Sequence, residues 1–265
     1  MNRTTTGDAS GLAAARQHYE EVGFCLTPPL LDAAQLPEAV ATMDRVIAGD
    51  YATGTGPLSR TVEPTTDPPH LVKIDQPQIS DPSISDLIRE SGVGPFAAAL
   101  LDAEMIQVWA VQLLHKPPAV EISNVGWHQD DDYWSEWWDG EVFTCWLALS
   151  DVGPDAGPLR FVPGSHRWGF LAAGNFFVQD LDSRAGFALP EGATWAEEPV
   201  IIPAGSASFH HRRTIHGSGP NTSGGPRRSY AIHMRTERST RLGNAPPEFT
   251  DYLSDPAIAP VIFGG

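Results

Sequence analysis

The feature that most constrains this fold is a change of periodicity at Glu104, after which short apolar segments alternate with clusters of glycine and proline. Alternation with a period of two is typical of strands that bury one face. The segments expected to form strands are 105–115, 144–150, 159–162, 200–202, 206–210 and 227–233. Many short strands after an N-terminal helical block predict a mainly β protein with flanking helices, built as a double-sheet jelly roll.

The N-terminal part of the chain favours helices. Helices are expected over 11–22, 32–48, 81–91 and 94–101, with short strands at 24–26 and 71–75. The apolar stripe of the second helix is formed by Leu36, Val40, Met43 and Ile47. Residues 51–69 are rich in Gly, Thr and Pro, which predicts a surface loop long enough to serve a function.

All 265 residues are expected to form one domain, because all-β barrels of this length are commonly single domains. The expected parts are a helical block at about 11–101, a jelly-roll core at about 104–236 and a C-terminal tail at about 237–265. Residues 241–265 hold four prolines, so the tail is expected either to fold over the barrel mouth or to be disordered. Whether this tail or the 51–69 loop forms a lid stays open.

Charge and cysteine content limit the partners. The chain has 17 basic and 33 acidic residues, a formal net charge of −16, so its surface should repel nucleic acid and phosphorylated substrates. Cys25 and Cys145 lie in apolar surroundings, which predicts a reducing compartment and no disulfide. The first ten residues are polar and no apolar stretch approaches 18 residues, so we expect a soluble, cytoplasmic protein that does not enter membranes. Its oligomeric state is left open.

Two histidines and a carboxylate stand out as candidate metal ligands. His128 and Asp130 are two residues apart in strand-favouring sequence, which would place both side chains on one face. His216 follows a later strand-like segment and completes a set that suits non-haem Fe(II), with one side left open for oxygen and a co-substrate. Asp132 is the alternative metal ligand, because on a strand its side chain would lie on the same face as that of His128. Asp131 would lie on the opposite face and should face substrate or solvent.

A candidate carboxylate clamp follows the distal histidine. Arg227 lies eleven residues after His216 and shares a strand face with Ser229. An arginine fork beside a hydroxyl binds a carboxylate well. Arg228 is the alternative, but its parity separates it from Ser229.

These motifs, together with the run Gly157-Pro158-Leu159-Arg160-Phe161-Val162-Pro163-Gly164-Ser165-His166, resemble the phytanoyl-CoA dioxygenase family of Fe(II)/2-oxoglutarate oxygenases. The resemblance extends from about Tyr19 to about Thr236 and implies a double-stranded β-helix with a cupin-like core. It also implies that His128, Asp130 and His216 bind Fe(II), and that Arg227 holds the distal carboxylate of 2-oxoglutarate.

Some members of that family, such as the ectoine hydroxylases, add a glutamine on the preceding strand and a tryptophan six residues after the first histidine. The matching positions here are Gln112 and Trp134. Ordinary packing on the sheet is the alternative for both. The resemblance implies Fe(II), 2-oxoglutarate and O2 as metal, co-substrate and oxidant, but the family name does not set the substrate.

An aromatic and acidic run follows the H-x-D pair, and we expect part of it to contact substrate. The residues concerned are Asp131, Glu136, Trp137 and Trp138. Aromatic faces and carboxylates favour a cationic or sugar-like ligand. A lid packed on the barrel is the plainer interpretation.

Three further histidines are not expected to bind the metal. His166 follows a Pro-Gly turn and is expected to form hydrogen bonds. Of His210 and His211, one is expected to point inward without touching iron.

The function predicted from all this is oxidation, by hydroxylation or otherwise, of a small polar molecule such as an amine, an amino acid or an aminosugar-containing natural product. Asp130 argues against the halogenating relatives, which replace this carboxylate by a small residue. Two alternatives stay open: a cupin-type metal enzyme that does not use 2-oxoglutarate, and a binding protein without chemistry on the same barrel.

Overall fold

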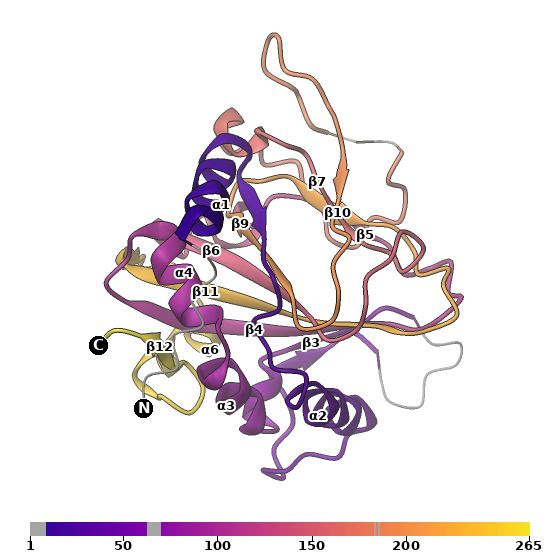
Figure 1. The fold of residues 1–265 in the computed structure, drawn as a ribbon, viewed down its shortest axis with the longest axis vertical. Helices are drawn as coiled ribbons and strands as arrows, with labels where there is room; N and C mark the ends of the chain where they lie inside the picture. The colour runs from indigo at the N-terminus through magenta and orange to yellow at the C-terminus, as the bar shows by residue number, and fades with distance from the viewer. Residues whose placement is uncertain (1–8, 63–69, 183, 185) are drawn as a thin grey trace.

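Two antiparallel sheets form the framework of the computed structural model, which describes residues 9–62, 70–182, 184 and 186–265. The larger sheet has the order β1-β9-β6-β11-β4-β3-β2, with β12 also paired to β4. Its strands are β1 (Phe24–Leu26), β9 (Ala207–His211), β6 (Trp138–Ala148), β11 (Arg227–Arg241), β4 (Ile106–Lys116), β3 (Val72–Asp75), β2 (Ser59–Arg60) and β12 (Val261–Phe263). The smaller sheet runs β5 (Val125–His128), β10 (His216–Ser218), β7 (Leu159–Phe161) and β8 (Glu198–Pro199). This is the mainly β, jelly-roll architecture that the strand series predicts (Figure 1).

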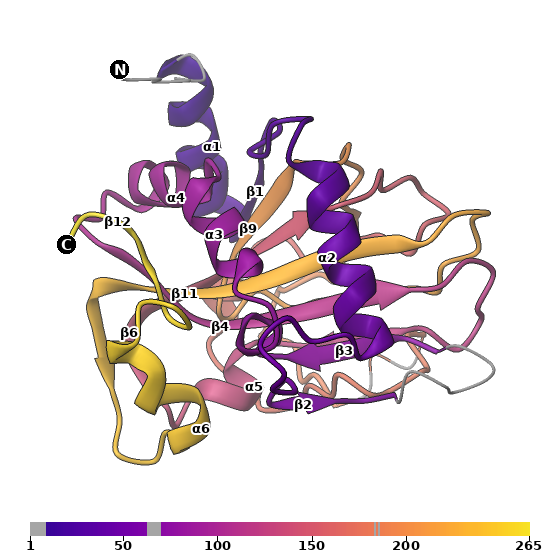
Figure 2. The ribbon, with the colours of Figure 1, turned by 90° about the horizontal axis from the view of Figure 1, so that it is seen from below.

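The helices cover one face of the larger sheet, as Figure 2 shows. They are α1 (Ala9–Val22), α2 (Leu36–Ala48), α3 (Ser83–Glu90) and α4 (Val93–Leu101). Between these helices and the sheet lies the main hydrophobic core, to which β6 contributes Cys145 and β11 contributes Ile232. The next residues on the same strands, Trp146 and Ala231, face the smaller sheet instead. The period of two thus divides each central strand between a structural core and an inner space between the sheets.

Several predicted boundaries differ from the structure. β11 continues to Arg241, well beyond the expected 227–233, and pairs with both β4 and β6. Residues 200–202 are not a strand, and Ile202 forms only an isolated bridge with Val152. In α2 the buried side chains are Ala39, Thr42, Met43 and Val46, while the other members of the expected stripe are half-buried against the same core.

The two segments suspected of forming lids have different outcomes. The C-terminal tail is ordered: it forms α6 (Pro247–Thr250) and a 3-10 turn (Asp251–Ser254), and β12 then pairs with β4. Disorder was therefore the wrong alternative for the tail. In the expected 51–69 loop, β2 pairs with β3, and residues 63–69 lie outside the described residues. In the part of the chain that the structure describes, no helix is long and apolar enough to cross a membrane.

Candidate active site

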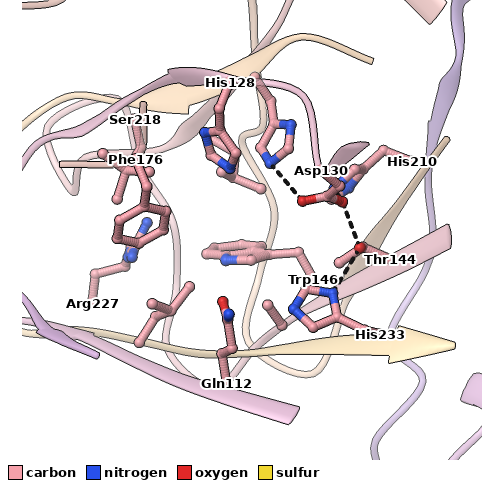
Figure 3. Close-up of a pocket in the computed structure, with 15 residues that line it drawn as sticks. Gln112, His128, Asp130, Thr144, Trp146, Phe176, His210, Ser218, Arg227 and His233 are labelled. Atoms are coloured by element: carbon pink, nitrogen blue, oxygen red, sulfur yellow. Dashed lines mark hydrogen bonds and ion pairs between the residues drawn. The ribbon is translucent and has the colours of Figure 1, made fainter. Parts of the chain in front are cut away.

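The three candidate metal ligands meet in a buried cavity between the sheets (Figure 3). His128 ends β5 and His216 begins β10, and the two residues are direct partners in the antiparallel pairing of these strands. Their ring centroids lie 4.1 Å apart. One ligand atom from each of His128, Asp130 and His216 lies within 4.8 Å of the other two.

The hydrogen bonds of both imidazoles leave the ring nitrogen that a metal would need. Nδ1 of His128 lies 2.8 Å from the carbonyl oxygen of Gly126, and Nδ1 of His216 lies 3.0 Å from that of Thr214. Each Nδ1 must therefore carry the proton and donate it, so Nε2 keeps a free lone pair. Burial lowers the pKa of both imidazoles, and in His216 the neighbouring His128 lowers it further. Both rings are thus neutral, the form in which histidine binds a metal.

The Asp130 carboxylate also lies beside the two imidazoles, but not because it continues the strand that holds His128. β5 ends at His128, and Asp130 already has helical backbone angles (φ −57°, ψ −31°) as the residue before the short helix α5 (Asp131–Trp134). The expectation of one continuous strand was therefore wrong, and so were the positions derived from it for Asp131 and Asp132. A turn of backbone immediately after the strand, rather than alternation along it, brings the carboxylate beside the imidazoles.

One oxygen of Asp130 is already occupied by protein donors. The Thr144 hydroxyl donates to Oδ2 at 2.7 Å, and Nε2 of His210 lies 3.2 Å from the same atom. The other oxygen, Oδ1, lies 3.8 Å from Nε2 of His216. Burial alone would raise the pKa of this carboxyl, but the hydrogen bond from His210 and the nearby imidazoles hold the pKa well below its usual range. Asp130 is thus an anion with one oxygen free for a cation.

The proton assignments continue to two further histidines. Because the single hydroxyl proton of Thr144 goes to Asp130, Nδ1 of His233, 2.9 Å away, must donate to the Thr144 oxygen. His210 likewise donates through Nε2. Burial lowers the pKa of His233 to about 4, so its Nε2 is an unprotonated acceptor. This atom and Nδ1 of His210 are buried and have no hydrogen-bond partner among the described residues.

The donor set fits an Fe(II) ion. Two neutral imidazoles and one carboxylate oxygen are the ligands of non-haem Fe(II) oxygenases, a set that leaves coordination positions free. Their other polar atoms are held by backbone carbonyls, Thr144 and His210, as outer-sphere partners hold metal ligands in general.

Arg227 lies at the other end of the cavity in Figure 3. Arg227 is 1% exposed and its guanidinium lies 5.1 Å from the ring centre of Trp146. Among the described residues it donates one hydrogen bond, from Nη1 to the carbonyl of Gly157. Nε and Nη2 have no partner among the described residues, and burial lowers the pKa of Arg227 to about 9. Arg228 points the other way and forms a paired contact with Asp44 at the surface. The arginine predicted from spacing is therefore the one that lines the cavity.

A buried lysine that the sequence did not single out supports this end of the cavity. Lys116, the register partner of Arg227, is fully buried and donates to the Ser218 hydroxyl at 2.6 Å and to the carbonyl of Gly219. Burial and the nearby Arg227 lower the pKa of Lys116 well below its usual value. Ser218 lines the cavity, where a hydroxyl that accepts from Lys116 can donate its own proton to an anion.

The remaining predicted site residues divide into two groups. Gln112 lines the cavity, with Trp146 and Phe176, which the sequence analysis did not identify. Ser229 is buried with its hydroxyl 3.4 Å from the carbonyl of Leu114, and it is not part of the cavity lining. Trp134 is also outside the lining and packs edge-on against His233, which is part of it.

The aromatic and acidic run does not form the expected substrate pocket. Asp131 is fully buried in ion pairs with Arg212 and Arg213, and so is not available to substrate. Trp138 is a core side chain, 1% exposed, in a cluster with Trp109 and Trp134.

The other two members of that run also lie away from the cavity. Trp137 packs on Phe249 of α6, and Glu136 is exposed. The plainer interpretation, an aromatic cluster packed on the barrel, is the one that the structure has.

The secondary histidines and the rival carboxylate are also placed. Asp132 accepts hydrogen bonds from the backbone N–H groups of Gln129 and Gly174. Nε2 of His166 lies 3.2 Å from the carbonyl oxygen of Glu20. Of the pair at 210 and 211, His210 is the one that points inward.

The family model for phytanoyl-CoA dioxygenase (PhyH) matches residues 19–229. The chain belongs to the phytanoyl-CoA dioxygenase family. The resemblance inferred from the motifs is thereby confirmed. Members of this family are dioxygenases that depend on Fe(II) and 2-oxoglutarate, and the chain is an oxidoreductase of that class.

The curated relatives of this PhyH-family chain carry diverse names. A probable alpha-ketoglutarate-dependent hypophosphite dioxygenase from Stutzerimonas stutzeri is 26% identical over 58% of the chain. An ectoine dioxygenase from Bordetella parapertussis is 27% identical over 80% of it. The chain spans about half the length of the first relative (53%) and 71% of the second.

Solved structures share the fold of this PhyH-family chain. The carbocyclase SnoK from nogalamycin biosynthesis, a non-heme alpha ketoglutarate dependent enzyme, superposes with a TM-score of 0.70 at 22% identity, over 88% of this chain and 87% of SnoK. The epimerase SnoN, in complex with Fe3+, alpha ketoglutarate and nogalamycin RO, gives 0.69 at 21% identity, over 94% and 91%. The predicted jelly-roll fold is confirmed.

Proposed function

We propose that this protein oxidises a small polar organic molecule, with Fe(II) held by His128, Asp130 and His216 and 2-oxoglutarate held by Arg227. The observation that carries the proposal is one cavity with a two-histidine, one-carboxylate cluster at one end and a buried, unpaired guanidinium at the other. A cupin-type metal enzyme without 2-oxoglutarate would have no use for that guanidinium, and a binding protein would have no use for the open donor cluster.

The protein's own groups perform three tasks in this proposal. Neutral His128 and His216 and the free oxygen of Asp130 bind the metal. Arg227 and the hydroxyl proton of Ser218 bind the distal carboxylate of the co-substrate, and the surrounding Trp146, Phe176 and Leu114 exclude water and strengthen that contact. When bound, the iron supplies the oxidising chemistry, in which 2-oxoglutarate and O2 are consumed and succinate and CO2 are released.

The substrate class is inferred from charge and from hydrogen-bonding capacity. The net charge of −16 disfavours acyl-CoA thioesters and other phosphorylated anions. Nε2 of His233 offers an acceptor that no described residue bonds. A neutral or cationic substrate with hydroxyl or amine donors satisfies both conditions.

The co-substrate assignment is tested by comparing two adjacent arginines. Arg227→Ala should raise the 2-oxoglutarate concentration needed for half-maximal turnover by at least about tenfold, because a buried charge-assisted contact worth roughly 1.5–3 kcal/mol is lost. The matched variant Arg228→Ala removes only the surface pair with Asp44 and should change this requirement little. Equal effects of the two substitutions, measured by succinate release with iron saturating, would contradict the assignment.

The substrate class is tested by a separate screen. Succinate release that depends on added substrate should appear with small amines, amino acids or aminosugars and not with acyl-CoA thioesters. Efficient oxidation of an acyl-CoA would refute the charge argument while leaving the metal and co-substrate assignments intact.

A further inference from the structure

A second cavity lies on the opposite face of the larger sheet, between α2 and α3, which run side by side over that face in Figure 2. Its volume is about 320 Å³, within the range of small-molecule sites of roughly 300–1,000 Å³. It shares no lining residue with the cavity of the metal cluster. The catalytic proposal gives this groove no role.

The floor of the groove carries a polar atom that has no partner. Tyr230 lies on β11 with 0% of its surface exposed, and its side chain belongs to the core between helices and sheet. Tyr230 is one of the lining residues of the groove, and its buried hydroxyl forms no hydrogen bond with any residue that the structure describes. A buried hydroxyl without a partner costs roughly 1–3 kcal/mol, so a ligand that bonds to it regains that free energy.

The rim of the groove is acidic. Glu38, Asp86 and Glu90 line it, and no lysine or arginine does. Arg45 pairs with Glu38 and Arg89 pairs with Asp86, both from outside the lining. Glu90 is exposed and has no ion pair with any described residue, so the lining includes one uncompensated carboxylate.

The lining also has apolar side chains, those of Ala39, Ile84 and Leu87. Apolar side chains together with one hydroxyl that lacks a partner and one carboxylate that lacks an ion pair favour a ligand with a short hydrocarbon part and an ammonium group. A bare metal ion is not favoured, because the described His, Cys, Asp and Glu residues form a metal-sized cluster only at His128, Asp130 and His216.

We propose that the groove between α2 and α3 is a binding site for a small organic ammonium ion, with Tyr230 and Glu90 as its polar contacts. Glu90 attracts the ammonium group and the Tyr230 oxygen accepts one of its N–H bonds. Ala39, Ile84 and Leu87 cover the hydrocarbon part. The site requires neither iron nor 2-oxoglutarate, so its test is independent of the proposed catalysis.

The experiment uses three probes of one shape and different charge: butylammonium, butanol and butyrate. Calorimetry and thermal unfolding of the full-length protein should show saturable binding of butylammonium in the millimolar range, at least about fivefold weaker binding of butanol, and none of butyrate. Butyrate binding as well as butylammonium would contradict a site selective for cations.

Two substitutions then localise the binding. Tyr230→Phe removes only the unpaired hydroxyl, so the free protein should be as stable as the original or more stable, while the affinity for butylammonium falls at least about fivefold. Glu90→Gln should weaken binding similarly, and Glu191→Gln, which removes an exposed carboxylate elsewhere, should not. Absence of saturable binding, or binding that none of these substitutions alters, would overturn the proposal and leave only a solvent-filled groove.

Discussion

The hydroxyl of Thr144 has one proton, and its destination fixes the hydrogen-bonding roles of two neighbouring groups. The proton goes to Oδ2 of Asp130, so His233 must donate to Thr144 through Nδ1. With Oδ2 also bonded to His210, only Oδ1 of Asp130 is left for a metal. A carboxylate held in this way would offer a metal one oxygen ligand.

Thr144→Val tests this arrangement, because valine keeps the shape of threonine and loses the hydroxyl. We expect the affinity for Fe(II) to fall by about 10- to 100-fold, the usual effect of losing an outer-sphere partner. Stability should fall by roughly 1–3 kcal/mol, because Nδ1 of His233 loses its acceptor. Iron titration of the metal-free protein measures it. Thr250→Val is the matched control, since Thr250 is equally buried and its hydroxyl bonds only the carbonyl of Pro246. An unchanged iron affinity in Thr144→Val would mean that Asp130 needs no such support.

At the scale of elements, the C-terminal segment is held by a close backbone contact. A methyl group placed on Gly94 in α4 would lie 2.3 Å from the carbonyl oxygen of Ile262 in β12. Only glycine allows the helix and this strand to approach so closely, and a larger residue must push the strand away from β4.

Gly94→Ala should therefore destabilise the fold by roughly 1–3 kcal/mol, as overpacking against backbone does. Gly11→Ala is the control, because Gly11 lies in α1 with nothing within 4 Å of the added methyl group, and alanine there should be neutral or slightly stabilising. Urea unfolding of both variants measures the difference. If Gly94→Ala proved as stable as Gly11→Ala, β12 would not be fixed against α4.

The elements also show where prediction from sequence stops. The hydrophobic period and the glycine and proline clusters predicted most strands and helices but not their ends, and motif spacing picked out His128, His216 and Arg227, which line one cavity. Strand parity failed at Asp130 because the backbone turns into α5 directly after β5, which no local pattern announced. The partners of Asp131 lie 81 and 82 residues away, so its ion pairs with Arg212 and Arg213 depend on the tertiary fold.

The site residues that were not predicted also depend on contacts between distant parts of the sequence. Lys116 and Ser218 are 102 positions apart and lie on β4 and β10, in different sheets, so their contact depends on the tertiary fold. One of His210 and His211 was expected to point inward. The partner of His210, Asp130, lies 80 residues away in the sequence and could not be predicted. A lone lysine at the end of a strand gave no signal that it would be buried.

At the scale of the whole molecule, buried histidines make stability depend on pH. Burial lowers the pKa of His115 to about 4, and burial together with His166 lowers the pKa of His211 to about 3. Both values lie below the ordinary value near 6.5, so in acid the unfolded chain binds protons that the folded protein does not. The stabilisation is complete above about pH 6.5 and is lost progressively as the pH falls toward 4.

We expect the free energy of unfolding to decline by several kcal/mol between about pH 6.5 and pH 4, since each tenfold difference in proton affinity is worth about 1.4 kcal/mol. Urea unfolding at a series of pH values measures the slope. His115→Gln should make the slope shallower even if it changes the stability at neutral pH. A slope identical to that of the unsubstituted protein would mean that His115 does not titrate as its burial requires.

β11 has different chemistry on its two faces. Arg227, Ala231 and His233 line the cavity of the metal cluster, and Tyr230 forms the floor of the groove beneath α2 and α3. The two compartments are thus separated by a single strand. An amine bound in the groove could change the dissociation constant of 2-oxoglutarate by some factor. Thermodynamic linkage then requires 2-oxoglutarate to change the dissociation constant of the amine by the same factor. Communication across this strand can therefore be measured from either side, and the two measurements must agree.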